Sequence, residues 1–399
     1  MKRWMWVGLI VLLVGLVVKV RAGYDVKVMV IDFEPGTVRQ DNRWNDPQVL
    51  EGQFITDVKN VSGGEGNYRI VDRVVVNDFP VKIDGFKYTI DSFNTCWSNR
   101  STCHSPDTAD YLKILSDYDV CGKRNRGEID ELWLWGGPYF GYWEAIMTGP
   151  GAFWTNGGPL TGSTCQKQLN IMGFNYERGV SEMFEDLGHR VEGTMRHVYG
   201  SWTAGSDSHA WNKYTLLDKD APGRAGCGNI HFAPNSTSDY DWGNTRTVTS
   251  SCEDWLNYPN LTGATQSFSC SKWGCDGYAY KKWWHSHLPK AAGTGPDGKL
   301  NNWWSYVFNY EGTTGTVATP TPTAIPTPTP TPTLTPTPAG SPTVSPTPTV
   351  KPKPTPRGKG RVKSEVTSPS PLLQKPLLVV LIDWIVTTVR QLFGGKIYG

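Results

Sequence analysis

A tract rich in proline and threonine divides this chain and limits where it can fold. Between Pro320 and Pro356 lie 14 of the chain's 29 prolines, mostly as Thr-Pro repeats without an aromatic residue among them. Such a tract has too little apolar area to form a core, so we expect it to stay extended as polyproline II. We therefore predict a folded domain at 23–312, a disordered stalk with a basic end at 313–371, and an apolar C-terminal helix at 372–399.

The N-terminus has the pattern of an export signal. Lys2 and Arg3 precede an apolar stretch, and Val20 and Ala22 occupy the −3 and −1 positions of a cleavage site. We predict a signal peptide at 1–22 and a secreted or cell-surface location. The alternative is an uncleaved anchor, because the apolar stretch is near the lower length limit for a membrane span.

The C-terminal helix predicts attachment to a surface. It follows a run of lysines and arginines, and its apolar residues recur at helical spacing with Asp383 in the middle. Since a mid-segment carboxylate argues against a full membrane span, we expect the helix to lie on a membrane or to dock on a partner. The net charge of +2 excludes a strongly basic nucleic-acid-binding protein, so we expect no nucleic-acid partner.

The cysteine content predicts disulfide bonds. The chain has eight cysteines, and an even number in an exported protein indicates up to four bridges. Zinc binding by Cys270 and Cys275 is the alternative, but no second pair of cysteines matches their spacing. We favour disulfides, with the connectivity left open.

The folded domain is predicted to be an α/β domain. Apolar runs rich in β-branched residues predict strands at 26–33, 68–76, 129–135 and 169–174. Helical patterns lie between or after them, at 49–58, 109–118 and 179–198. Alternation of this kind predicts a mainly parallel sheet flanked by helices. Beyond residue 200 the periodicity is lost, and we expect an irregular, disulfide-crosslinked C-terminal half packed on the sheet.

Four sequence blocks resemble those of a family of secreted proteins whose activity is uncharacterised. They are Gly173-Phe174-Asn175-Tyr176-Glu177-Arg178, Gly188-His189-Arg190-Val191-Glu192, Gly228-Asn229-Ile230-His231-Phe232 and His287-Leu288-Pro289-Lys290. The resemblance covers the folded domain only and implies no catalytic roles. The Thr-Pro tract resembles the stalks that separate exported bacterial domains from their anchors.

The helix predicted at 179–198 carries the main candidate site. Opposite its apolar stripe lie Glu185, His189 and Glu192, each about one turn from the next. A divalent metal could bind His189 with Glu192 or Glu185, and we take His189, Glu192 and His231 as the candidate ligands. Alternatively, His189 orients Glu192 as a catalytic base. The third interpretation is a solvated helix face on which these charges only pair with one another.

A second group of candidates surrounds the strand at 129–135. Ligands of open α/β sheets bind beyond the carboxyl ends of the strands, and Glu144 follows the Gly-Gly-Pro loop there, so we assign it as acid or nucleophile. The candidate substrate-binding residues are Trp135, Trp143, Trp154 and Asn175. Flat indole rings can stack on sugars, although Trp135 could equally be a core residue of the strand.

These candidates predict an exported, surface-displayed hydrolase of an extracellular polymer. A glycan is favoured over a peptide, because glycoside hydrolysis needs two carboxyl groups. A non-catalytic glycan-binding or adhesion domain is the alternative, and a metal-dependent hydrolase is the third possibility. If Glu144, His189 and Glu192 meet in one cleft, the enzyme is favoured; if they lie on separate surfaces, the binding domain is.

Overall fold

A five-stranded sheet lies at the centre of the described chain, which is residues 23–313 of a computed structural model. In spatial order its strands are β2 (Gly66–Val76), β1 (Tyr24–Phe33), β3 (Glu131–Gly136), β5 (Leu169–Asn175) and β4 (Ala145–Thr148). The first four are parallel, and β4 pairs antiparallel with β5 at one edge. The predicted mainly parallel sheet is therefore confirmed. The short strand β4 was not predicted, because four residues carry no usable periodicity.

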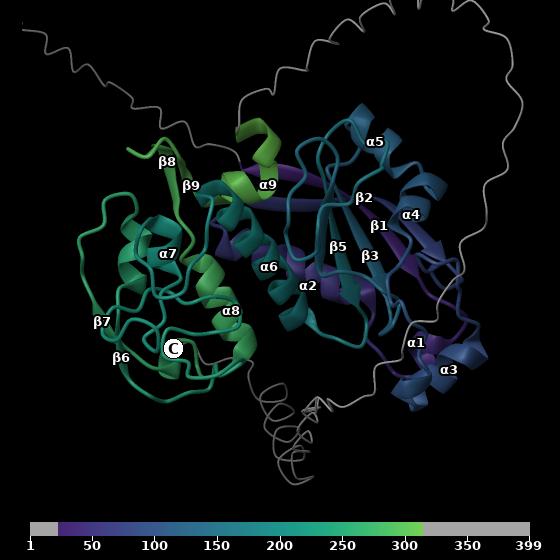
Figure 1. The fold of residues 1–399 in the computed structure, drawn as a ribbon, viewed down its shortest axis with the longest axis horizontal. Coiled ribbons are helices and arrows are strands. Elements are labelled where there is room, and N and C mark those ends of the chain that lie inside the picture. Colours follow the sequence, from purple (N-terminus) through teal and green to yellow (C-terminus); the bar gives the residue numbers. More distant parts are fainter. Residues whose placement is uncertain (1–22, 314–399) are drawn as a thin grey trace, which may run out of the picture. The chain divides into compact units, whose positions relative to one another are not determined.

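Helices cover both faces of this sheet (Figure 1). They are α1 (Val38–Asp41), α2 (Pro47–Val61), α3 (Ile90–Ser98), α4 (Tyr111–Asp117), α5 (Val120–Arg126) and α6 (Val180–Tyr199), with a 3-10 turn η1 (Arg100–Thr102). Successive side chains of a strand point to opposite faces. Val28 and Val30 of β1 accordingly pack on the side of α2 and α6, whereas Met29 and Ile31 pack on the side of α3, α4 and α5.

The two helices on the first face begin where local sequence signals place them. The Asp46 side chain accepts a hydrogen bond from the backbone N–H of Gln48, and Pro47 occupies the first turn of α2. In α6, the Glu182 side chain accepts from the N–H of Gly179, and the helix ends at Gly200 in the left-handed conformation. Both helices match their predicted ranges to within a few residues.

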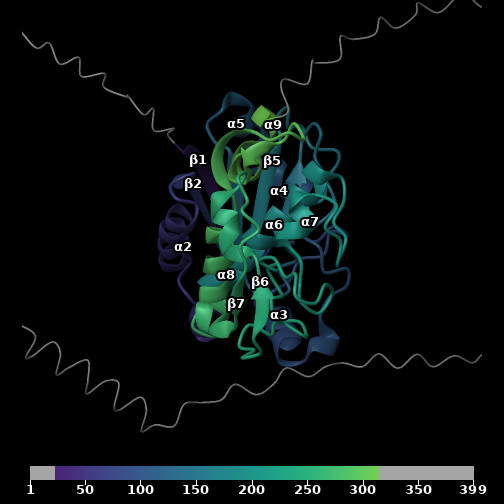
Figure 2. The same cartoon turned by 90° about the vertical axis from the view of Figure 1, so that its left-hand side faces the viewer.

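Short elements make up the C-terminal half of the described chain. They are α7 (Ala210–Tyr214), β6 (Val248–Ser250), η2 (Cys252–Asn257), β7 (Gln266–Phe268), η3 (Cys270–Lys272), α8 (Gly277–Ser286), β8 (Lys290–Thr294), β9 (Leu300–Asn302) and α9 (Trp303–Thr313). Figure 2 looks at the molecule from this side, with α8 in front and α2 beside it. Helix α6 packs against the sheet and also against α8 and α9. One continuous hydrophobic core therefore joins the sheet to the irregular half.

All eight cysteines form disulfides, as predicted. The pairs are Cys96–Cys103, Cys121–Cys165, Cys227–Cys252 and Cys270–Cys275. The bridges crosslink both halves of the domain rather than the C-terminal half alone. The zinc alternative for Cys270 and Cys275 is wrong, because the two sulfurs are bonded to each other. Four disulfides are consistent with a secreted protein.

The predicted terminal segments lie outside the described residues. These are the signal peptide at 1–22, the stalk at 313–371 beyond Thr313, and the helix at 372–399. Within 23–313, no helix has both the length and the hydropathy needed to cross a membrane.

Candidate functional site

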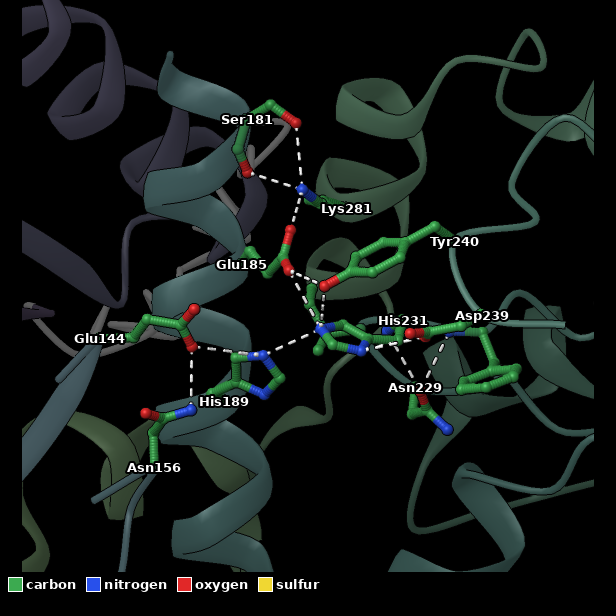
Figure 3. Close-up of polar contacts among 12 residues, drawn as sticks. Glu144, Asn156, Ser181, Glu185, His189, Asn229, His231, Asp239, Tyr240 and Lys281 are labelled. Atoms are coloured by element: carbon green, nitrogen blue, oxygen red, sulfur yellow. Dashed lines mark hydrogen bonds and ion pairs between the residues drawn. The ribbon is translucent and has the colours of Figure 1, made fainter. Parts of the chain in front are cut away.

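Two histidines and a glutamate from distant parts of the chain meet beside α6. Glu185 and His189 lie one turn apart on the helix, and His231 comes from a loop of the C-terminal half. The Nε2 atoms of His189 and His231 are 3.0 Å apart, and Glu185 Oε1 is 3.0 Å from His231 Nε2 (Figure 3). One ligand atom from each of the three residues lies within 4.8 Å of the others, so together they could hold a metal ion.

A glycine in α6 allows the histidine loop to approach the helix. A Cβ atom at Gly188 would lie only 2.3 Å from a side-chain carbon of Ile230. With no side chain at Gly188, Ile230 packs directly on the helix backbone, and its neighbour His231 reaches His189. Any side chain at position 188 would therefore push Ile230, and with it His231, away from α6.

The loop that carries His231 is fixed by covalent and polar contacts. It begins at the Cys227–Cys252 bridge, and the Asn229 side chain accepts hydrogen bonds from the backbone N–H groups of His231 and Phe232. The buried Tyr280 hydroxyl lies 2.7 Å from the carbonyl oxygen of Asn229 and 2.9 Å from that of Phe232. Such a crosslinked turn holds the imidazole in position before any ligand binds.

Both imidazoles are oriented by carboxylates at their outer nitrogens. Glu192 Oε2 lies 2.9 Å from His189 Nδ1, and Asp239 Oδ1 lies 3.1 Å from His231 Nδ1. A carboxylate can only accept, so His189 Nδ1 donates a proton to Glu192, and the neutral ring of His189 keeps its lone pair on Nε2. Asp239 lies at ion-pair distance from His231 Nδ1. His231 Nε2 then lies within hydrogen-bond distance of both the His189 lone pair and the Glu185 carboxylate oxygen. This arrangement favours a positive charge between the three atoms, either a proton or a metal ion.

The acidic surroundings increase the affinity of the site for positive charge. Burial alone would lower the pKa of His189. The hydrogen bond and charge of Glu192, with the charges of Glu144 and Glu185, outweigh burial and raise that pKa to about 9. In the absence of a metal, His189 therefore carries a proton near neutral pH.

Lys281 fixes the glutamate in its ionised form. This buried lysine of α8 lies with its Nζ 2.6 Å from Glu185 Oε2, and it also contacts the hydroxyl and carbonyl oxygens of Ser181. Burial would raise the pKa of Glu185, but the hydrogen bond with His231 and the Lys281 charge lower it to about 2. Glu185 Oε1 is thereby left facing the histidines.

Glu144 approaches the same histidine from the sheet side. Its Oε2 is 3.5 Å from His189 Nε2 and accepts a 2.9 Å hydrogen bond from Asn156. Asn156 lies in the loop after β4, next to Thr155. The backbone of this loop can lie against α6 because residue 193 is glycine, where a Cβ would be 2.3 Å from the Thr155 carbonyl oxygen. Burial raises the pKa of Glu144 above its usual value. Its side chain keeps 43% exposure, so it remains accessible to a ligand.

A cavity of about 310 Å³ opens beside this group. Glu144, Glu185 and Asn175 line it, together with Tyr240, whose hydroxyl lies 3.0 Å from Glu185 Oε1 and 3.2 Å from His231 Nε2. Tyr240 has a positive φ of 57°, a conformation that is strained for an aromatic residue and is concentrated at functional sites.

The three predicted catalytic residues do meet, but their roles differ from those predicted. Glu144 and Glu192 both contact His189. Glu192 is buried, and its second oxygen accepts from the N–H of Ile230, so neither oxygen is free to act as a base or a metal ligand. Thus Glu192 orients His189, which reverses the predicted relation, and Glu185 takes its place among the metal-ligand candidates.

The predicted substrate-binding residues divide into two groups. Trp135 is fully buried and donates from its indole N–H to Glu51, so the prediction that it contacts a substrate is wrong. Trp143 and Trp154 are 43% and 52% exposed. Of these four residues, only Asn175 lines the cavity, and Trp143 and Trp154 are exposed outside its lining.

The alternative of a solvated helix face is also wrong. Glu185, Arg190 and Glu192 are all buried, because the C-terminal half covers the side of α6 that faces away from the sheet. Amphipathic periodicity could not reveal this second packing partner. The sequence analysis also missed Asp239, Tyr240 and Lys281. The glycines at 188 and 193, on either side of the His-to-Glu segment, were the available signal of close packing.

No protein-family model matches the chain, and no curated protein matches it in sequence. The resemblance of the four sequence blocks to a secreted family therefore stays a prediction.

Proposed function

We propose that the domain is an exported, metal-dependent hydrolase, with Glu185, His189 and His231 as the ligands of a divalent cation. The observation that carries this proposal is the pair of Nε2 atoms 3.0 Å apart, each ring held by a carboxylate at Nδ1. Outer carboxylates of this kind orient histidine ligands and increase their basicity. Two imidazole nitrogens and one carboxylate oxygen form a donor set typical of catalytic zinc, with one position left for water.

The neighbouring side chains support hydrolysis rather than purely structural metal binding. A zinc ion held by Glu185, His189 and His231 would lower the pKa of a bound water to about 7 and so supply a nucleophile at neutral pH. Glu144 lies next to His189, is accessible, and has a raised pKa, so it can take a proton from an attacking water and pass it to a leaving group. Tyr240 can donate its hydroxyl proton to an oxygen that gains negative charge.

The substrate that suits this chemistry is an acyl bond, amide or ester, within an extracellular polymer. Hydrolysis of a glycosidic bond by two carboxyl groups has less support, because Glu192 is occupied by His189 and Ile230. The preference for a glycan stays a prediction. Trp143 and Trp154 are the two exposed tryptophans of the described chain, and they leave a non-catalytic polymer-binding domain as the second candidate.

Metal content tests the proposal directly. The purified protein, incubated with zinc and then freed of excess metal, should retain about one equivalent per chain, as measured by mass spectrometry of the elements. His189→Ala and His231→Ala should each lose most of the metal. The matched control is His197→Ala, which removes an exposed histidine from the same helix and should keep it.

The same preparations then separate hydrolase from binding domain. Zinc-loaded wild type should release new amino or hydroxyl groups from amide- or ester-containing polymers. Glu144→Gln should reduce this rate by about a hundredfold or more while retaining metal. A wild-type protein that binds no metal would contradict the proposal. A protein that binds metal and polymer without hydrolysis would favour the second candidate.

A further inference from the structure

The cavity beside the proposed metal ligands is strongly acidic. Its charged lining residues are Asp107, Glu144, Arg178, Glu182, Glu185 and Asp186. Five of these six carry a carboxyl group, so the cavity should attract a positively charged ligand. A cluster of acids alone is common at protein surfaces, and the pairing of each group therefore decides whether the cavity binds anything.

Most of these charges are neutralised or held by a partner. Asp107 pairs with the buried Lys82, and Glu185 pairs with Lys281. Glu182 accepts from the backbone N–H of Gly179 at the start of α6. The one basic group, Arg178, pairs with Glu177, its neighbour in sequence. None of these hydrogen bonds or ion pairs involves the carboxyl group of Asp186.

Asp186 is the exception within the cavity. It is only 6% exposed, and within residues 23–313 it has neither a hydrogen bond nor an ion pair. Buried carboxyl groups are normally hydrogen-bonded or paired, so this one has capacity for a cationic partner that enters the cavity.

Aromatic rings complete the cavity wall. Tyr139 and Tyr240 both line it, and both have positive φ angles, 64° and 57°. Non-glycine residues rarely adopt this conformation, so two strained tyrosines on one cavity indicate that the position of their rings matters. Tyrosine faces attract cations through their negative π surface. The cavity thus combines an unpaired buried carboxyl group with two tyrosines in its wall.

We propose that this cavity binds the lysine-like side chain of a peptide substrate, with Asp186 as its counter-charge, next to the amide bond that is hydrolysed. A peptide is favoured over an amino-sugar polymer because a terminal ammonium on a flexible four-carbon stem can reach a buried carboxyl group. The amino group of a sugar is instead held directly on its ring. This inference rests on the proposed hydrolase, whose substrate class it specifies.

Peptide pairs that differ only in lysine against norleucine test the inference without any mutation. The two side chains are similar in length, and only lysine is charged. With the zinc-loaded full-length protein, we expect kcat/KM to favour lysine at one position by about ten- to a hundredfold, the value of one charge-assisted contact. Cleavage of both peptides at the same rate at every position would overturn the inference.

Asp186→Asn identifies the residue responsible. This isosteric change should reduce the lysine preference to within about threefold and leave the metal content and the norleucine rate unchanged. Asp91→Asn is the control, since it removes an exposed carboxylate that does not line the cavity, and it should keep the preference. An Asp186→Asn protein that folds and keeps the full preference would overturn the assignment.

Binding measurements separate failure of the inference from failure of the proposed function. If no peptide is cleaved, the hydrolase proposal fails for peptides. Tighter binding of the lysine peptide than of the norleucine peptide, abolished in Asp186→Asn, would still support the cationic cavity, and equal binding would overturn it. Binding of glucosamine oligomers through Asp186, without binding of lysine peptides, would overturn the peptide assignment in favour of an amino-sugar polymer.

Discussion

From Tyr24 to Asn175 the chain builds its core from strands and the helices between them, whereas from Ala210 to Asn302 it uses short elements, aromatic side chains and disulfides. In the first region, the backbone N–H and C=O groups of the strands form hydrogen bonds with one another in one five-stranded sheet. In the second, loops such as the one carrying His231 are held by side chains and a bridge. The candidate site lies where the two regions meet, on α6.

The regular region, Tyr24 to Asn175, positions part of the site, and the irregular region, Ala210 to Asn302, completes it. Helix α6 supplies Glu185 and His189, and the loop before β4 supplies Glu144. The irregular region supplies His231 and Tyr240. Because the irregular loops lack a strand ladder, their geometry should depend on their crosslinks more than that of the sheet does.

The largest expected effect is the removal of a disulfide bond, and its consequence for zinc binding should differ between the two regions. Replacing Cys227 and Cys252 by serine opens a bridge with a sequence separation of 25, which should cost about 3–4 kcal/mol of unfolding free energy. It should also weaken zinc binding, because His231 follows Cys227 closely. The measurements are denaturant unfolding with a chelator present and zinc titration of the folded protein.

The matched control is the bridge from Cys121 to Cys165 in the sheet region. Its separation of 44 predicts a slightly larger loss of about 4 kcal/mol. Its removal should leave zinc affinity unchanged, since it lies outside the group that holds the histidines. Equal weakening of zinc binding by both replacements would show that the site depends on global stability and not on the irregular loop.

An intermediate effect is expected for the carboxylate that orients His189. Glu192→Gln keeps an oxygen for the N–H of Ile230 but removes the charge that faces Nδ1. Zinc affinity should fall by about ten- to a hundredfold, with little change in melting temperature. Glu182→Gln on the same helix is the control and should bind zinc as wild type does. An unchanged affinity in Glu192→Gln would remove Glu192 from the site.

The smallest net effect is expected in acid, because one buried group in each region responds to protons in the opposite direction and the two responses partly offset each other. Burial lowers the pKa of His285, in the irregular region, to about 3. Burial and the nearby Glu34 raise the pKa of Asp32, in the sheet, to about 6. As pH falls from about 6.5 to 3, unfolding exposes a histidine that then binds a proton, so stability decreases. As pH falls from about 6 to 3.8, Asp32 binds a proton more readily in the folded state, so stability increases.

Two variants should therefore change the pH dependence in opposite directions. His285→Phe should make the unfolding free energy less sensitive to acid, by up to about 1.4 kcal/mol per pH unit. Asp32→Asn should make it more sensitive, because the compensating proton uptake is lost. Unfolding curves between pH 4 and 7 measure both slopes. Slopes that change in the same direction would contradict this assignment of the two groups.

Much of the fold followed from the sequence because its signals are local. The strand at 26–33 and the helix after Asp46 depend on β-branched runs and on a capping residue followed by proline, and both are present as predicted. The irregular region was predicted only as irregular. Its packing depends on aromatic contacts between residues far apart in sequence, such as Trp211 with Trp303, and on a cysteine pairing that spacing does not determine.

The sequence by itself determined that the cysteines pair and that Glu185, His189 and Glu192 share one side of a helix. It predicted export from a segment that lies outside the described residues. At 100° per residue these three positions lie within about 60°, one sixth of the helix circumference, so periodicity cannot assign their separate roles. Only the tertiary structure decided those roles. The loop of His231 packs on Gly188 and meets Glu185 on one side of His189, while Glu192 turns both its oxygens toward His189 Nδ1 and the N–H of Ile230.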